Sequence, residues 1–384
     1  MKRTGLLLVL ISVLMVTLVF TSCNRGQSSA SSREASSGGS DIIKVKIGWS
    51  PPDTTGVFKT ATDYMEMAAV DAKPHGFDIE VITRTAASHA DTQGQVSAIE
   101  NLIQNEVDCI VVSPADVDSL IAVFKRANEV NIPIIMVNML DEHPDFKVTS
   151  FIGFDNAQAA AVSAYSMLDA LGGPGVLGAG EKVNIPLSTD LDLVWWQNLY
   201  KDVPRNSISG DIAILDGVPG VIYTLERNRG FNEVIRQFPN VRVRTTLAAH
   251  WERQPAVAAS ENILQNFPNI DGIFAMSAEM ALGAAIAVKN AGLEGKVIVI
   301  SNDGTPESVQ AIRDGVINAE SWHGFPEWGW YATKFAAMMV LGQEVPYKFD
   351  IRPRTEYAGN ADNFYPTPKL EPIDWAAIKA AAKK

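Results

Sequence analysis

Two kinds of hydrophobic pattern alternate along the first half of this chain. Short runs that are apolar throughout, or that alternate apolar and polar residues, have the length of β-strands. Between them apolar residues recur at helical spacing, as at Val96, Ile99 and Leu102. This alternation predicts a parallel sheet with helices on both faces. The expected strands are residues 45–49, 77–83, 109–113, 133–137 and 150–153, and the expected helices are residues 57–72, 92–105 and 117–129.

The same alternation starts again near residue 212, after an irregular stretch. The chain has 384 residues, which is more than one hydrophobic core usually supports. We therefore expect an α/β fold with two doubly wound parallel-sheet lobes. In the second half the expected strands are residues 212–215, 241–247, 272–275, 297–300 and 319–322, and the expected helices are residues 225–237, 255–266, 279–291, 307–314 and 327–341.

The irregular stretch, residues 172–209, contains one amphipathic segment, residues 190–203, with two adjacent tryptophans. A large aromatic side chain usually marks buried contact area. The favoured interpretation is that Trp195 and Trp196 pin a surface insertion to the second lobe. The alternative is a lid over a ligand cleft.

The N-terminus has the pattern of a secretory signal peptide. Lys2 and Arg3 precede an apolar run that is shorter than the roughly 20 residues of a bilayer span, and small polar residues follow before Cys23. We expect residues 1–22 to be the signal peptide and Cys23 to be lipidated, since the junction resembles a relaxed lipobox. The next residues are rich in Ser and Gly, so residues 23–40 are expected to form a flexible tether.

Composition narrows the class of protein. The net charge is −12, and removing residues 1–22 with Lys2 and Arg3 brings it near −14, which argues against binding nucleic acid. Besides Cys23 only Cys109 remains, in an apolar run, and we expect a buried thiol. The sequence has no GxSxG nucleophile motif, no phosphate-binding GxxxxGK[ST] loop and no HExxH pair. We expect no enzyme, no cofactor and no metal.

Candidate chemistry lies just after the expected strands. In open parallel sheets, ligands bind beyond the carboxyl ends of the strands. Most residues there are neutral hydrogen-bonding groups or aromatic rings, a mixture that suits a small uncharged ligand with C–H faces, such as a sugar or polyol. These residues are Trp49, Ser50, Ser113, Asn138, Asp216, Trp251, Ser277, Asp303, Trp322 and His323.

Several short segments, in order over about 300 residues, carry a family resemblance. They are residues 111–116 (VVSPAD), 131–134 (NIPI), 152–156 (IGFDN), 227–231 (RNRGF), 273–275 (IFA), 279–284 (EMALGA) and 302–306 (NDGTP). From about residue 41 to residue 354 the chain resembles the ribose-binding-like, type I branch of the periplasmic sugar-binding proteins of ABC transporters, in a lipoprotein form. LacI-type repressors use the same fold for their effector domains.

The resemblance implies roles for individual residues. Arg227 matches an arginine that reaches into the cleft, and Asp303 matches an aspartate that accepts hydrogen bonds from sugar hydroxyls. Phe58 and Trp251 match positions where aromatic rings stack on the ligand. Where the ribose pattern has an arginine this chain has Met139, which argues against ribose itself. The full set of expected ligand-binding residues is Ser50, Phe58, Ser113, Asn138, Arg227, Trp251, Ser277, Asp303 and His323.

The resemblance also implies a hinge with three crossings between the lobes, near residues 154–156, 323–325 and 350–352. The N-terminal lobe would comprise residues 41–154 and 324–350, and the C-terminal lobe residues 156–323 and 351–384. Such a protein is expected to be a monomer outside the inner membrane, held to the membrane by its N-terminal lipid. It would close on a sugar or polyol and pass it to the permease of an ABC importer.

Two other functions remain open. A ligand-sensing receptor for chemotaxis or signalling would share the fold and differ only in its partner. A carbohydrate-acting enzyme would need two carboxyl groups roughly 5 to 9.5 Å apart, and Asp303 has only Asp216 as a candidate partner. A LacI-type regulator is disfavoured, because the leader stands where its DNA-binding domain would lie.

Overall fold

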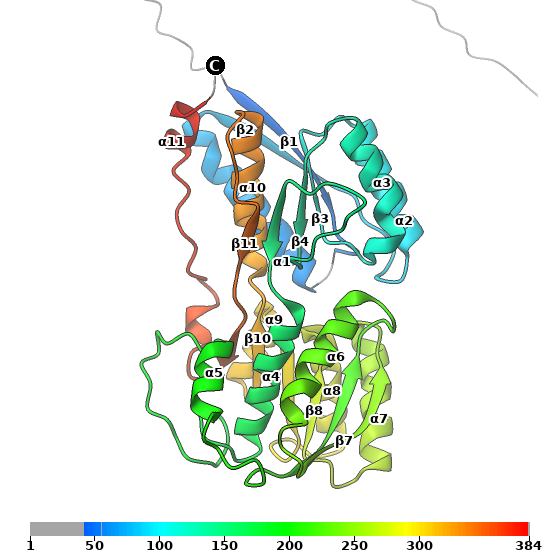
Figure 1. The fold of residues 1–384 in the computed structure, drawn as a ribbon, viewed down its shortest axis with the longest axis vertical. Coiled ribbons are helices and arrows are strands. Elements are labelled where there is room, and N and C mark those ends of the chain that lie inside the picture. The colour runs from blue at the N-terminus through cyan, green and yellow to red at the C-terminus, as the bar shows by residue number, and fades with distance from the viewer. Residues whose placement is uncertain (1–41, 55, 383–384) are drawn as a thin grey trace, which may run out of the picture. The chain divides into compact units, whose positions relative to one another are not determined.

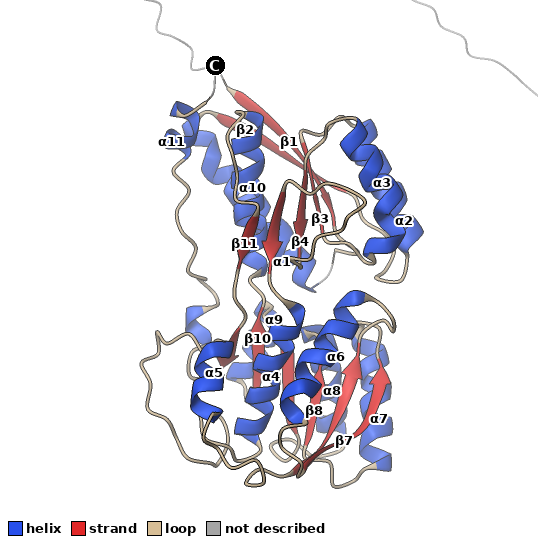
Figure 2. Cartoon of the chain, viewed as in Figure 1, coloured by secondary structure: helices blue, strands red, loops and turns tan. Residues whose placement is uncertain are grey.

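A computed structural model describes residues 42–54 and 56–382 (Figure 1). The predicted signal peptide, the tether and Cys23 lie outside the described residues. As predicted, the described residues form two α/β lobes, each built on a six-stranded sheet with helices packed against it (Figure 2).

The sheet of the first lobe has the strand order β2-β1-β3-β4-β5-β11, and all neighbouring strands are parallel. Every residue of β3, β4 and β5 is buried, because helices cover both faces of a parallel sheet. The strands are β1 (Ile43–Ser50), β2 (Phe77–Thr83), β3 (Cys109–Val112), β4 (Ile134–Val137), β5 (Ser150–Gly153) and β11 (Lys348–Asp350), and the helices are α1 (Gly56–Ala72), η1 (Lys73–His75), α2 (Thr92–Gln104), α3 (Val117–Glu129) and α10 (Phe325–Val340).

The sheet of the second lobe has the order β7-β6-β8-β9-β10-β12, parallel except for β12, which runs antiparallel to β10. Its strands are β6 (Gly210–Asp216), β7 (Val241–Ala248), β8 (Gly272–Ala275), β9 (Ile298–Asp303), β10 (Ala319–Trp322) and β12 (Arg354–Tyr357), and its helices are α4 (Asn156–Ala170), α5 (Leu193–Tyr200), α6 (Ile222–Ile235), α7 (Arg253–Asn266), α8 (Ala278–Asn290) and α9 (Pro306–Arg313).

Polar residues between strand and helix fix several helix starts. The side chains of Asp91, Asp116 and Asp155 accept backbone N–H bonds at the starts of α2, α3 and α4. Thr305 caps α9 with Pro306 in the first turn. These caps set where each strand-to-helix loop ends, and those loops surround the cleft.

The chain passes between the lobes at the three predicted places. It crosses from β5 to α4, from β10 to α10, and from β11 to β12. Cys109, predicted to be a buried thiol, is buried and free in β3, and burial raises the pKa of its thiol.

The prediction that residues 351–384 all belong to the second lobe is wrong in its last part. Residues 361–365, including η2 (Ala361–Asn363), pack on Trp322 of the second lobe. The chain then returns to the first lobe, where α11 (Trp375–Ala380) buries Trp375 against Phe77 at a ring distance of 5.3 Å. The physical reason is burial of apolar surface, because Trp375 and Ile378 complete the first-lobe core. The result is a fourth connection between the lobes (Figure 1).

The insertion between the lobes carries α5, shorter than the predicted segment. Trp196 is fully buried in the second-lobe core, and its Nε1–H donates to Thr355 Oγ1 at 2.8 Å. Trp195 packs against the same core. The tryptophans therefore anchor the insertion to the second lobe, as the favoured interpretation held.

Across residues 42–54 and 56–382, no helix has the length and apolar character needed to span a membrane.

Candidate functional site

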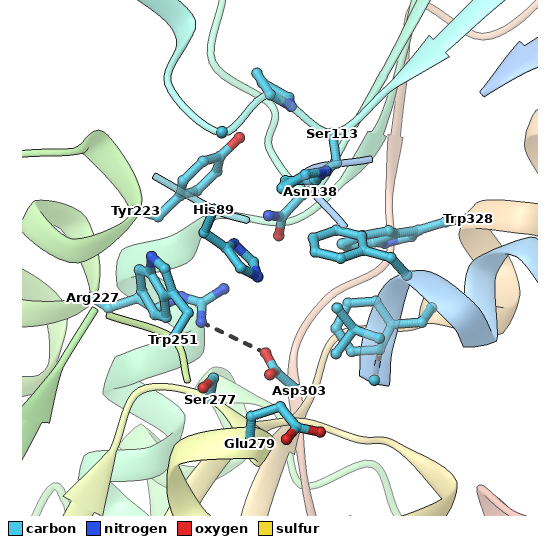
Figure 3. A pocket seen from close by; sticks show the side chains of 17 residues that line it. His89, Ser113, Asn138, Tyr223, Arg227, Trp251, Ser277, Glu279, Asp303 and Trp328 are labelled. Carbon is cyan, nitrogen blue, oxygen red and sulfur yellow. Dashed lines mark ion pairs between the residues drawn. The ribbon is translucent and has the colours of Figure 1, made fainter. Parts of the chain in front are cut away.

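One pocket lies where the strand ends of the two lobes meet. It encloses about 660 Å³ of empty space, part of it continuous with solvent. Both lobes line it, with aromatic rings and polar groups (Figure 3). The lining residues are Pro52, Gly56, Val57, Phe58, His89, Ser113, Pro114, Ala115, Asn138, Tyr223, Arg227, Trp251, Ser277, Glu279, Asp303, Phe325 and Trp328.

Seven of the nine residues predicted to bind ligand line this pocket. The chain brings them together from both lobes, because each stands near the end of a strand or the start of a helix. They are Phe58, Ser113, Asn138, Arg227, Trp251, Ser277 and Asp303.

Arg227 and Asp303 form the charged centre of the second-lobe wall. Arg227 lies on α6 and is only 4% exposed; its Nη1 lies 3.6 Å from Asp303 Oδ1. Its Nε–H donates to Asn156 Oδ1 at 2.9 Å, and its Nη1 donates to the Met276 carbonyl. Asp303 Oδ2 in turn accepts the Ala278 N–H at 2.9 Å. Burial lowers the pKa of the guanidinium, and the nearby carboxylate opposes that effect. The pair is held rigidly by the second lobe itself.

His323 was predicted to touch the ligand, but it stands behind Asp303 and does not line the pocket. Its ring is fully buried, 4.0 Å from the ring of Phe154, with Nδ1 3.2 Å from Asp303 Oδ1. Burial lowers the pKa of His323 to about 4, so the imidazole is neutral at pH 7. From the end of β10, the His323 ring therefore packs behind the Asp303 carboxylate.

Ser50 was also predicted to touch the ligand and does not line the pocket. It is fully buried at the end of β1, and its carbonyl accepts the side-chain N–H of Gln95 at 3.1 Å. That glutamine also bonds the backbone of Ser113 and Ala115, so it fixes the loop after β3 from behind. Ser50 thus belongs to the layer that shapes the pocket wall.

Aromatic rings form opposite sides of the pocket. Trp251 of the second lobe lies with its ring centroid 5.3 Å from the Arg227 guanidinium carbon, a cation–π arrangement. Trp328 lies across the pocket from it (Figure 3). Phe58 lies 5.5 Å from the ring of His89. A flat ligand with C–H faces can pack between such rings.

Three pocket residues have an unusual backbone. The φ angles of Asn138, Trp251 and Asp303 are 74°, 69° and 116°, in the left-handed region that side chains disfavour. Gly217 makes room for the Trp251 ring, since a Cβ there would lie 1.9 Å from Trp251 Cζ2. Strain of about 1–3 kcal/mol per residue collects at functional sites. The surrounding fold therefore holds these three residues in a backbone conformation that costs free energy.

Five polar or aromatic lining residues were missing from the predicted set: His89, Tyr223, Glu279, Phe325 and Trp328. Tyr223 stands one helical turn before Arg227 on α6, and its hydroxyl lies 3.6 Å from Met139 Sδ in the first lobe. Its spacing from Arg227 was a usable signal. His89, Glu279 and Trp328 gave no local signal, because tertiary structure alone brings them to the pocket.

Each charged residue that lines the pocket lies close to a group of opposite charge. Glu279 accepts from Arg253 at 2.9 Å, and His89 Nε2 lies 3.1 Å from Asp53 Oδ2. Arg227 faces Asp303. No group of three or more His, Cys, Asp or Glu residues suited to a metal ion occurs among the residues that the structure describes. The pocket is balanced in charge and fits a neutral ligand better than an ionic one.

The chain belongs to the periplasmic binding proteins: residues 47–344 match the family described as "Periplasmic binding protein domain". This is a family of binding proteins rather than enzymes. Among relatives, the ribose import binding protein of Bacillus subtilis is 27% identical over 275 residues, 72% of this chain and 75% of that protein. The D-allose-binding periplasmic protein of Escherichia coli is 27% identical over 257 residues, 65% of this chain and 70% of that one.

Solved structures agree with the fold. A periplasmic solute-binding protein of an ABC transporter from Actinobacillus succinogenes, with bound D-allose, superposes with a TM-score of 0.68 at 26% identity. The match covers 83% of this chain and all of the other.

Proposed function

We propose that this protein captures a sugar or polyol in the pocket between its lobes and delivers it to an ABC importer. The observation that carries the proposal is the pocket itself: a buried, charge-balanced Arg227 and Asp303 pair with Trp251 and Trp328 on opposite sides. An arginine fork and a carboxylate can bond adjacent hydroxyls, while the rings pack on C–H faces. The names of relatives that bind ribose or D-allose support the same ligand class.

The proposed cycle uses the hinge. The lobes open at the three central crossings, the ligand enters, and contacts from both lobes favour the closed state. The permease would recognise that closed state. In the closed state the ligand would be held by Arg227, Asp303, Trp251 and Trp328, together with Phe58, Ser113, Asn138 and Ser277.

A thermal-shift panel of the fragment that starts at Asp41 tests this function. The probes are D-ribose, D-allose, D-fructose, xylitol and myo-inositol. A probe at about 100 times its dissociation constant adds about 2.7 kcal/mol to folding stability. We expect one class of probe to raise the melting temperature of the wild type and neither Arg227→Ala nor Asp303→Ala to respond.

The matched control is Arg229→Ala, because Arg229 lies on the same helix but is half exposed and pairs with Glu226 and Glu233. It should keep the full response. The proposal is wrong if no probe shifts the wild type and mass spectrometry of the denatured protein finds no bound sugar. Chemical change of a bound probe would instead support a carbohydrate-acting enzyme.

The membrane attachment belongs to the same proposal. Residues 1–22 would be removed on export and Cys23 would carry the lipid, leaving a monomer outside the inner membrane. We expect Cys23→Ser to move the protein from the membrane fraction to the soluble fraction after cell fractionation. An unchanged distribution would contradict lipidation.

A further inference from the structure

The two lobes use the polar atoms of the pocket differently. In the second lobe Arg227, Ser277 and Asp303 all bond to protein atoms: Ser277 Oγ, for instance, accepts the Met280 N–H at 3.3 Å. In the first lobe Ser113 Oγ and Asn138 Oδ1 are buried and have no protein partner among residues 42–54 and 56–382. The second-lobe wall is satisfied without ligand, and the first-lobe wall is not.

Trp328 completes this first-lobe set. It lies in the first turn of α10, is fully buried and lines the pocket, and its indole Nε1 has no hydrogen-bond partner among the described residues. Its ring is fixed by an edge contact with Phe325 at 4.5 Å and by Phe154 at 6.5 Å. A rigid, buried donor at the edge of a pocket is suited to a ligand oxygen.

Other tryptophans show that this N–H is exceptional. The other fully buried indoles among the described residues donate to a protein oxygen, as expected of a buried N–H, and so does the half-buried indole of Trp330. These donors and acceptors are Trp49 to Thr62, Trp196 to Thr355, Trp322 to Glu327, Trp330 to Glu371 and Trp375 to Asp71. Trp328 lies in the pocket wall, and its buried N–H has no acceptor among the described residues.

We propose that the Trp328 indole N–H donates a hydrogen bond to a ligand oxygen and, together with Ser113 and Asn138, penalises closure of the empty cleft. The proposal rests on the sugar-binding function above. In the closed cleft these three groups have lost water and lack a protein partner, so each costs about a factor of ten in the closing equilibrium until a ligand oxygen or hydroxyl meets it. The ligand supplies the missing partners, and closure follows binding.

The first test compares Trp328→Phe with Trp330→Phe. Trp330 lies on the same helix, outside the pocket, and its Nε1 bonds the Glu371 carbonyl. We expect Trp328→Phe to weaken binding of the tightest probe of the panel about tenfold by calorimetry, and Trp330→Phe to change it less than about twofold.

Monodeoxy analogues of that probe separate a lost hydrogen bond from altered packing. One analogue, lacking the acceptor oxygen, should bind the wild type about tenfold more weakly and lose nothing further with Trp328→Phe. If Trp328→Phe weakens every analogue by the same factor, the residue acts through packing alone and the proposal is wrong. A Trp328→3-benzothienylalanine variant keeps the ring shape without the N–H and serves if phenylalanine disturbs the fold.

A second readout needs no ligand. Removing the unsatisfied donor should make the empty protein close more often, so small-angle scattering should give a smaller radius of gyration for ligand-free Trp328→Phe than for wild type and Trp330→Phe. An unchanged or larger radius contradicts the penalty on empty closure. If the wild type binds no probe and carries no bound sugar, the proposed function fails, and the scattering comparison still decides whether Trp328 opposes closure.

Discussion

At the scale of single residues, the second-lobe wall depends on a chain of buried polar contacts. Asn156 bonds Arg227, Arg227 faces Asp303, and Asp303 is backed by the neutral ring of His323. The side chains of Arg227 and Asp303 are 5% and 8% exposed, so water cannot solvate either charge if the other is removed. A buried ion pair broken on one side costs far more than an exposed one.

We therefore predict strong coupling between Arg227→Ala and Asp303→Ala in ligand-free protein. Each single change should lower the free energy of unfolding by about 3–5 kcal/mol, because it leaves a buried charge alone. The double change should cost clearly less than the sum. Urea unfolding of the wild type, the two single variants and the double variant measures these losses. The control Arg229→Ala should unfold with a free energy within about 0.5 kcal/mol of the wild type. Additive losses would show that the two residues do not act as a pair.

At the scale of elements, the β10–β12 pair buries two carboxyl groups opposite each other. Glu320 and Glu356 are directly paired across the antiparallel strands, and both are fully buried. Glu320 Oε1 accepts from Ser308, while both oxygens of Glu356 lack a partner within the described residues. Burial raises the pKa of Glu320 to about 8 and that of Glu356 well above its usual range. A proton must stay on this pair at neutral pH.

This buried pair should make folding stability fall as pH rises. The unfolded chain releases the Glu320 proton near pH 4.5, the ordinary value for a glutamate, and the folded chain keeps it to about pH 8. Between these two pH values the free energy of unfolding should fall by up to about 1.4 kcal/mol per pH unit. In Glu320→Gln that slope should be smaller. Urea midpoints at pH 5, 6.5 and 8 measure it, and parallel profiles for variant and wild type would contradict the assignment.

At the scale of the whole described molecule, the C-terminal segment connects the lobes a fourth time. Arg313 bonds Asp362 and the Tyr365 carbonyl in the second lobe, while Trp375 Nε1 donates to Asp71 Oδ2 at 2.8 Å in the first. Between these two sites the Glu371 carbonyl accepts a hydrogen bond from Trp330 Nε1 on α10. The last helix thus stabilises the lobe that the N-terminal half of the chain builds.

Trp375→Ala should therefore destabilise the first lobe selectively. Truncating a buried aromatic costs about 3–5 kcal/mol. Native-state hydrogen exchange should show faster exchange in β1, β2 and α1, with the second lobe close to wild type. Trp196→Ala, which empties a matching site in the second-lobe core, should give the reverse pattern. Equal loss of protection in both lobes after either change would contradict this division.

The sequence by itself determined what local patterns encode. Apolar runs and helical spacing predicted five strands of each sheet, because burial on two faces demands continuous apolar strands, as in β3 and β8. The edge strands β11 and β12 were not predicted. The strand-end rule and the family resemblance located Ser113, Asn138, Arg227 and Asp303, since residues after parallel strands converge at one sheet edge.

Only the tertiary structure decided which of those residues face the pocket and which stand behind it. Ser50 and His323 occupy strand ends like their neighbours, but both side chains are buried behind the pocket wall. Their surroundings come from distant parts of the chain: Gln95 bonds the Ser50 carbonyl, and Phe154 packs on the His323 ring. The local sequence pattern likewise could not predict that Trp328 lines the pocket or that Trp375 returns to the first lobe. Both depend on which gap between packed elements an indole can fill, and that gap exists only once the lobes are assembled.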